Sequence, residues 1–152
     1  REQNLVHQLA SALPHLTISE ITLTQIQVNV DDARELSRGL SQNKTLESLR
    51  ITNLAASSPE AMSIMIQTCV GPTSTLRELY LYGNDTITDT EMLMLLNLLE
   101  KNSTLNLLDL STLSSLSSIS WLALARVLGS SHCSLKALQV TVNETITDEV
   151  II

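Results

Sequence analysis

The chain has 152 residues, of which 43% are hydrophobic, and a formal net charge of −7. This hydrophobic content excludes a disordered chain, and the length is enough for one domain with a sizeable core. The acidic balance excludes nonspecific binding to nucleic acid or to an anionic membrane, because both need a basic protein surface.

Five segments of the chain share one pattern, an apolar residue, two variable residues, and then apolar, variable, apolar. They begin at Ile18, Leu46, Leu76, Leu105 and Leu135, so successive segments start 28 to 30 residues apart. A fixed period in this range indicates a stacked repeat. The alternation within each segment predicts a short strand with one buried face.

The period divides the chain into units of one domain. We expect the end of a preceding repeat at 1–17, complete repeats at 18–45, 46–75, 76–104 and 105–134, and a truncated repeat at 135–152. Terminal repeats normally carry a polar cap, and neither end shows one. We therefore expect 1–152 to be a fragment of a longer repeat domain.

Each predicted strand is followed by an amphipathic helical pattern. In the third unit, Asp89 is placed to be the N-cap of the helix. The predicted buried helical faces, in chain order, are Ala33, Leu36, Ser37 and Leu40; Met62, Met65, Ile66 and Cys69; Met92, Leu95, Leu96 and Leu99; and Trp121, Leu124, Ala125 and Leu128. We interpret Trp121 as a packing residue, because it aligns with methionines in the neighbouring units.

The spacing of these elements predicts a curved stack. Paired strands lie about 4.8 Å apart, whereas packed helices need about 8–10 Å. The predicted fold is therefore α/β, with a parallel sheet on the concave side and helices on the convex side.

The third unit carries the pattern Leu-x-x-Leu-x-Leu-x-x-Asn, formed by Leu76, Leu79, Leu81 and Asn84. Together with the period and the long helix, this pattern resembles the ribonuclease-inhibitor type of leucine-rich repeat, a horseshoe-shaped solenoid. In that family the Asn side chain bonds backbone groups inside the turn. Three units depart from the pattern, and we expect their turn backbone to bond water or neighbouring backbone instead. The residues at this position are Ile26, Leu54 and Leu113.

The linkers Asn43–Leu46 and Asn102–Leu105 are similar to those in the leucine-rich-repeat region of NLR-type innate immune receptors. The resemblance implies a protein–protein recognition module, the ligand-sensing or autoinhibitory region of a larger receptor. The alternative is a stand-alone inhibitor or scaffold that blocks a partner enzyme. The pattern specifies neither a ligand nor an oligomeric state.

No catalytic constellation, phosphate-binding glycine motif or metal-ligand pattern is visible in the sequence. We therefore expect no enzymatic activity, no metal and no cofactor. Cys69 and Cys133 lie two repeats apart, too far for a disulfide. Free thiols indicate a reducing compartment, so we expect a cytoplasmic protein.

Four Asn-x-Ser/Thr sequons begin at Asn43, Asn84, Asn102 and Asn143. Asn84 and Asn143 occupy the inward position of the repeat, where a glycan could not fit. Asn43 and Asn102 recur because the linker recurs. We interpret all four as structural residues, with glycosylation as the alternative.

The outward positions of the predicted sheet form the candidate binding surface. Tyr80 and Tyr82 lie on the third strand, with Arg50 and Asp109 on the strands beside it. Tyr and Arg dominate binding hot spots. The alternative is that the tyrosines only stabilise neighbouring strands. The candidate partner-binding residues are Tyr80, Tyr82, Arg50, Asp109, Glu78 and Gln139.

Overall fold

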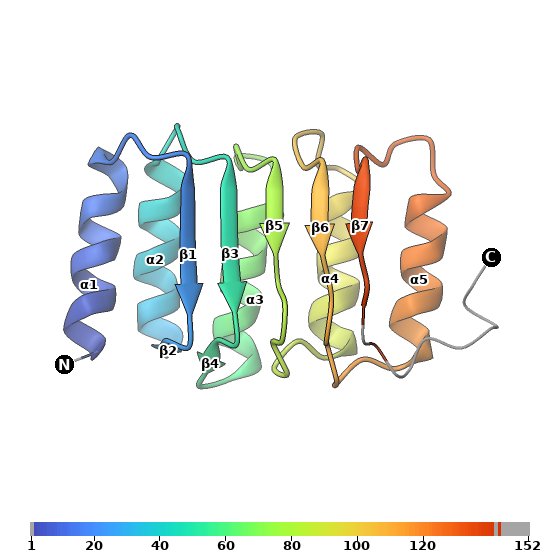
Figure 1. The fold of residues 1–152 in the computed structure, drawn as a ribbon, viewed down its shortest axis with the longest axis horizontal. Helices are drawn as coiled ribbons and strands as arrows, with labels where there is room; N and C mark the ends of the chain where they lie inside the picture. Colours follow the sequence, from blue (N-terminus) through green and yellow to red (C-terminus); the bar gives the residue numbers. More distant parts are fainter. Residues whose placement is uncertain (1, 142, 144–152) are drawn as a thin grey trace.

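The computed structural model describes residues 2–141 and residue 143, in which strands and helices alternate along the chain (Figure 1). The main strands are β1 (Glu20–Thr24), β3 (Ser48–Thr52), β5 (Glu78–Tyr80), β6 (Leu107–Asp109) and β7 (Ala137–Gln139). The helices are α1 (Glu2–Ala12), α2 (Val30–Gln42), α3 (Pro59–Val70), α4 (Asp89–Leu99) and α5 (Ser118–Leu128). Three short elements complete the chain, η1 (Leu13–His15), β2 (Gln27–Val28) and β4 (Ala55–Ala56).

The main strands form one parallel sheet in the order β1-β3-β5-β6-β7, which is their order in the chain. Equivalent residues of the repeats pair, so that Leu49 lies between Ile21 and Leu79. The predicted parallel sheet is therefore confirmed. The short strands β2 and β4 pair separately, also in parallel.

One face of the sheet is covered by the helices, which lie behind the strands in Figure 1. The inward residues of the strands form the core with the helices and are all buried: Ile21, Leu23, Leu49, Ile51, Leu79, Leu81, Leu108 and Leu110. The residues between them face away from the helices. We call this second side of the sheet the open face. The predicted curvature stays a prediction.

The helices bury most of the predicted faces, including every predicted residue of α3 and α4 and the side chain of Trp121. In α5 the prediction is wrong at Leu128, which is 40% exposed, while Val127 is buried. The buried face of α5 includes Ser120. This serine donates a hydrogen bond to Asp89 of the preceding repeat. This hydrogen bond joins α5 to the start of α4.

The predicted N-cap of α4 is also wrong by one residue. Thr88 is the N-cap and forms a capping box with Glu91. Asp89, the first helical residue, instead accepts hydrogen bonds from the backbone N–H and hydroxyl of Ser117, the N-cap of α5. These bonds lower the pKa of Asp89, with the Ser117 hydroxyl making the largest contribution. Asp89 thus joins the starts of two consecutive helices.

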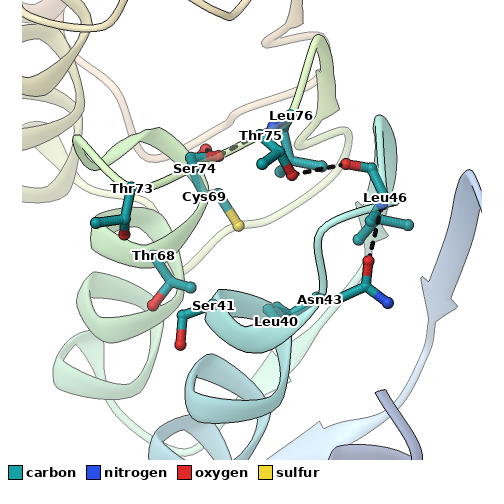
Figure 2. A pocket seen from close by; sticks show the side chains of 10 residues that line it. All are labelled: Leu40, Ser41, Asn43, Leu46, Thr68, Cys69, Thr73, Ser74, Thr75 and Leu76. Atoms are coloured by element: carbon teal, nitrogen blue, oxygen red, sulfur yellow. Dashed lines mark hydrogen bonds between the residues drawn. The ribbon is translucent and has the colours of Figure 1, made fainter. Parts of the chain in front are cut away.

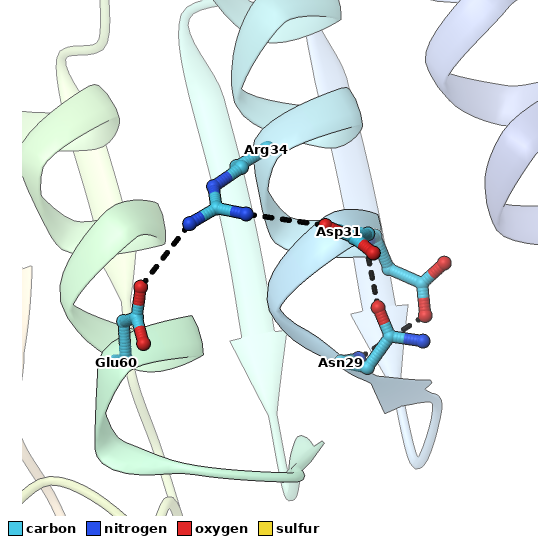
Figure 3. Close-up of polar contacts among 5 residues, drawn as sticks. Asn29, Asp31, Arg34 and Glu60 are labelled. Carbon is cyan, nitrogen blue, oxygen red and sulfur yellow. Dashed lines mark hydrogen bonds and ion pairs between the residues drawn. The ribbon is translucent and has the colours of Figure 1, made fainter.

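The start of α2 is joined to α3 by a comparable surface contact. Asn29 caps α2 in a capping box with Asp32. Arg34 lies between the two helices and forms ion pairs with Asp31 at 3.1 Å and with Glu60 of α3 at 3.3 Å (Figure 3). All three side chains are largely exposed, so each pair contributes little to stability on its own. The contact links α2 and α3 at the surface of the molecule.

The turns after the strands are closed by asparagines of the following repeat. Asn84 Oδ1 accepts from the backbone N–H of Leu54 at 2.8 Å, and Asn143 Oδ1 accepts from that of Leu113 at 2.8 Å. The expectation that these turns bond water or neighbouring backbone is therefore wrong at both positions. An apolar residue is tolerated there because the next repeat supplies the missing acceptor.

The linker asparagines have an equivalent structural role. Asn43 and Asn102 are buried. Asn43 Nδ2 donates to the carbonyl of Leu13 at 2.7 Å, and its Oδ1 accepts from the N–H of Leu46 at 2.8 Å. Asn102 Nδ2 donates in the same way to the carbonyl of Val70 at 3.2 Å. Burial of these side chains supports the interpretation of the sequons as structural residues.

Candidate recognition face

The open face brings candidate residues of four strands into one transverse row. Arg50 pairs in register with Tyr80, Tyr80 with Asp109, and Asp109 with Gln139. Thr22 of β1 completes the row beside Arg50. The row crosses the sheet perpendicular to the strands, since consecutive repeats place equivalent residues side by side.

Arg50 and Tyr80 form the centre of this row. The guanidinium carbon of Arg50 lies 3.8 Å from the centroid of the Tyr80 ring, a cation–π contact. Arg50 Nε also donates to Glu20 Oε1 at 2.9 Å. This hydrogen bond is the largest cause of the raised pKa of Arg50. The guanidinium is therefore held in place by two neighbouring strands.

Glu78 holds the other side of Tyr80. The Tyr80 hydroxyl donates to Glu78 Oε2 at 3.2 Å, two residues earlier on the same strand. Desolvation is the largest cause of the raised pKa of Tyr80, followed by the hydrogen bond to Glu78. The ring, the guanidinium and the two carboxylates thus form one connected cluster, which we call the Arg50–Tyr80 cluster, made of Glu20, Arg50, Glu78 and Tyr80.

Tyr82 lies just beyond the end of β5 and is 43% exposed. Its backbone carbonyl accepts from the N–H of Asn53 at 3.2 Å, which fixes the main chain but leaves the side chain outward. At the ends of β1 and β3, the hydroxyl of Thr24 lies 2.9 Å from that of Thr52. The Tyr82 side chain is therefore accessible to a partner, while its main chain is fixed to the neighbouring repeat.

The structure does not bring all predicted residues into the cluster. Asp109 is only 8% exposed, and its Oδ1 accepts from the backbone N–H of Ser111 at 2.9 Å. Gln139 is exposed on β7, two strands from Tyr80. The sequence prediction did not include Glu20 in the site. Glu20 carries a charge opposite to that of Arg50 and lies one repeat before it, so the sequence contains a signal for this ion pair.

A small pocket lies elsewhere, among the ends of α2 and α3 and the linkers that follow them (Figure 2). Its volume is about 20 Å³, room for one water molecule. Burial raises the pKa of the Cys69 thiol in its lining to about 12, so this thiol is a poor nucleophile. The pocket is a packing defect between helices rather than a ligand site.

Metal binding has no support in the described part of the chain. Within residues 2–141 and 143, no three His, Cys, Asp and Glu side chains are grouped so that they could share a metal ion. Cys69 and Cys133 are free thiols, the first buried and the second half-buried.

Across residues 2–141 and 143, no helix combines the length and the apolar character that crossing a bilayer requires.

The chain was compared with protein-family models, curated proteins and solved structures, and similar proteins were found among the solved structures. No protein-family model matches the chain, and neither does any curated protein. Among solved structures, it is similar to leiomodin-1 actin-binding site 2, with a TM-score of 0.64 and 17% identity over 83% of this chain and 71% of that one. It is also similar to a chain from the complex of Rad7 and Elc1 in yeast, with a TM-score of 0.67 and 25% identity. That similarity covers 99% of this chain and 35% of the other.

The sheet, the helices and these similarities together define the class of the protein. It has an α/β, leucine-rich-repeat-like fold with a parallel sheet whose strands follow chain order. The Arg50–Tyr80 cluster lies on the face of the sheet that the helices leave open.

Proposed function

We propose that the chain is a protein–protein recognition module whose binding surface is the open face around Tyr80 and Tyr82. The observation that carries this proposal is the stacking of Arg50 over the Tyr80 ring, with the exposed side chain of Tyr82 two residues further along the chain. Tyr and Arg are the residues most enriched in binding hot spots. A cluster already held by Glu20 and Glu78 loses little side-chain entropy when a partner docks on it.

The printed descriptions of the similar structures support a protein partner. One is an actin-binding site, and the other is a complex of two proteins. The similarity to only part of the second chain is consistent with this fold as a module of a longer protein. Following the resemblance of the linkers, we place the chain in the ligand-sensing or autoinhibitory region of a larger NLR-like receptor. The two free thiols favour the cytoplasm as its compartment.

The test compares the chain with a variant that carries both Tyr80→Ala and Tyr82→Ala. Proteins that the unchanged chain captures are purified and titrated against both chains. Loss of two hot spots should weaken binding by more than about 2 kcal/mol, or about 30-fold. The matched control replaces Asn97 and Gln67 with Ala on the exposed side of α4 and α3, and should keep full affinity. Equal binding by the tyrosine variant and the control would remove this site.

A further inference from the structure

A hollow in the open face lies beside the Arg50–Tyr80 cluster, one row nearer the starts of the strands. In this row Ser48 pairs in register with Glu20 on one side and with Glu78 on the other. The hollow has a volume of about 190 Å³, room for several water-sized groups. It is lined by Ser19, Glu20, Glu47, Ser48, Arg77 and Glu78.

Ser48 at the floor of the hollow has an unusual environment for a hydroxyl. The residue is only 9% exposed, and among the described residues its Oγ has no hydrogen-bond partner. Buried polar groups nearly always have a partner, because leaving one unpaired costs about 1–3 kcal/mol. A group bound in the hollow would supply the missing partner.

The charges around the hollow leave one negative charge uncompensated. Three carboxylates, those of Glu20, Glu47 and Glu78, face two guanidinium groups. Arg50 pairs with Glu20 at 2.9 Å, and Arg77 lies 3.7 Å from Glu47. Glu78 has no cationic partner among the described residues and accepts only from the Tyr80 hydroxyl. The hollow is therefore suited to a ligand that carries a single positive charge.

The hydrogen-bond acceptors in the hollow also indicate which type of cationic group would fit there. Glu20 uses Oε1 for Arg50 and Glu78 uses Oε2 for Tyr80, and the second oxygen of each has no partner within the described chain. With Ser48 Oγ, three acceptors remain on three adjacent strands. A primary ammonium has three N–H donors around one compact charge, whereas a guanidinium is a planar fork of five donors. Among the described residues, these carboxylates are not grouped in a way that could hold a metal ion.

We propose that this hollow binds the side-chain ammonium of a lysine that a partner protein presents. The ammonium donates to Glu20, Glu78 and Ser48, while the lysine stem passes over the neighbouring strands. This inference deepens the proposed function and rests on it, because the same partner would also contact Tyr80 and Tyr82. Its test needs no partner, so that the two proposals can fail separately.

The test titrates the whole chain with Nα-acetyl-lysine methylamide and follows backbone amide signals by two-dimensional NMR. The matched probe, Nα-acetyl-norleucine methylamide, has a similar stem without the charge. The lysine probe should shift the amides of Ser48, Leu49 and Glu78 in a saturable manner, and added salt should weaken its binding. Equal shifts with norleucine, or no saturable shift at Ser48, would refute the proposal.

Three variants then assign the binding to the hollow. Ser48→Ala, Glu20→Gln and Glu78→Gln should each weaken lysine binding by about two- to five-fold, as expected for partly exposed charge contacts. Glu100→Gln, which makes the same charge change on an exposed residue after α4, should leave it unchanged. Ser48→Ala should not lower the melting temperature, because it removes an unpaired buried hydroxyl. Unchanged affinity in Ser48→Ala and Glu78→Gln would mean that the probe binds elsewhere.

The two proposals are separated by comparing these results with partner binding. If the lysine probe binds as described but the tyrosine variant keeps its partner, the hollow stands and the tyrosine site fails. If the tyrosine variant loses its partner but the probe does not bind, the recognition face stands and the lysine proposal fails.

Discussion

The side chain of Asn84 closes the turn that contains Leu54, one repeat earlier. Its Oδ1 accepts from the Leu54 N–H at 2.8 Å, while its Nδ2 donates to the carbonyls of Ile51 at 2.7 Å and Leu81 at 2.8 Å. One buried amide therefore satisfies backbone groups of two consecutive repeats. Such a bond makes each turn depend on the presence of the next repeat.

Asn84→Ala should lower the free energy of unfolding by roughly 3 kcal/mol or more, because it leaves three buried backbone groups without partners. Urea unfolding followed by circular dichroism measures the effect. Asn97→Ala, on the exposed side of α4, is the control and should stay within about 0.5 kcal/mol. A cost for Asn84→Ala no larger than that of the control would contradict the role of the amide.

The residue before the turn position of each of the four complete repeats has a left-handed backbone conformation. Substitutions at two of these residues should change stability in opposite directions. Thr112 has φ 56° and Gly83 has φ 70°. A β-branched residue is strained in this region. Thr112→Asn should therefore raise stability by about 1 kcal/mol, because Asn tolerates this conformation better.

Gly83→Ala should lower stability at the equivalent position of the third unit. A Cβ there would lie 2.3 Å from Asn53 Oδ1, in addition to the cost of the backbone conformation. Thermal melts of the two single variants, at Gly83 and at Thr112, should shift in opposite directions from the unchanged chain. Shifts of the same sign would show that the backbone of the two turns is not equivalent.

The inward leucines should contribute far more to stability than the outward residues. Leu79→Ala and Leu108→Ala each remove a fully buried side chain and should cost roughly 2–5 kcal/mol. Gln139→Ala, on the open face, should cost less than about 0.5 kcal/mol. The midpoints of denaturant unfolding provide the comparison, and equal costs would mean that the two faces of the sheet are assigned wrongly.

The lowered pKa of Asp89 predicts a dependence of stability on pH. Because its pKa in the folded chain lies below the ordinary value of 3.8, its contribution is fully present above that value. It is lost as pH falls through the folded pKa. The stability difference between the unchanged chain and Asp89→Asn should therefore be largest near neutral pH and shrink below pH about 4.

Unfolding curves of both proteins at a series of pH values measure this difference. Asp31→Asn is the matched control, since Asp31 is exposed and its ion pair with Arg34 lies on the surface. A difference for Asp89→Asn that stays constant down to the acid limit would contradict the assignment of the carboxylate to Ser117 and Ser120.

The sequence alone determined the parallel sheet, its strand order and the separation of inward from outward residues. The reason is the period: when Ile21, Leu49 and Leu79 recur at equivalent places, each unit can bury its apolar face only against the next. Propensity and alternation then decide which residues point inward.

Only the tertiary structure decided how side chains about thirty residues apart meet. It placed Asn84 against Leu54, turned Asp109 back to its own backbone, and stacked Arg50 on Tyr80. It also left the Ser48 hydroxyl, between two glutamates, without a hydrogen-bond partner among the described residues. These contacts depend on rotamers and on the exact approach of neighbouring units, which alternation and period do not encode, because many side-chain arrangements share the same pattern of apolar and polar positions.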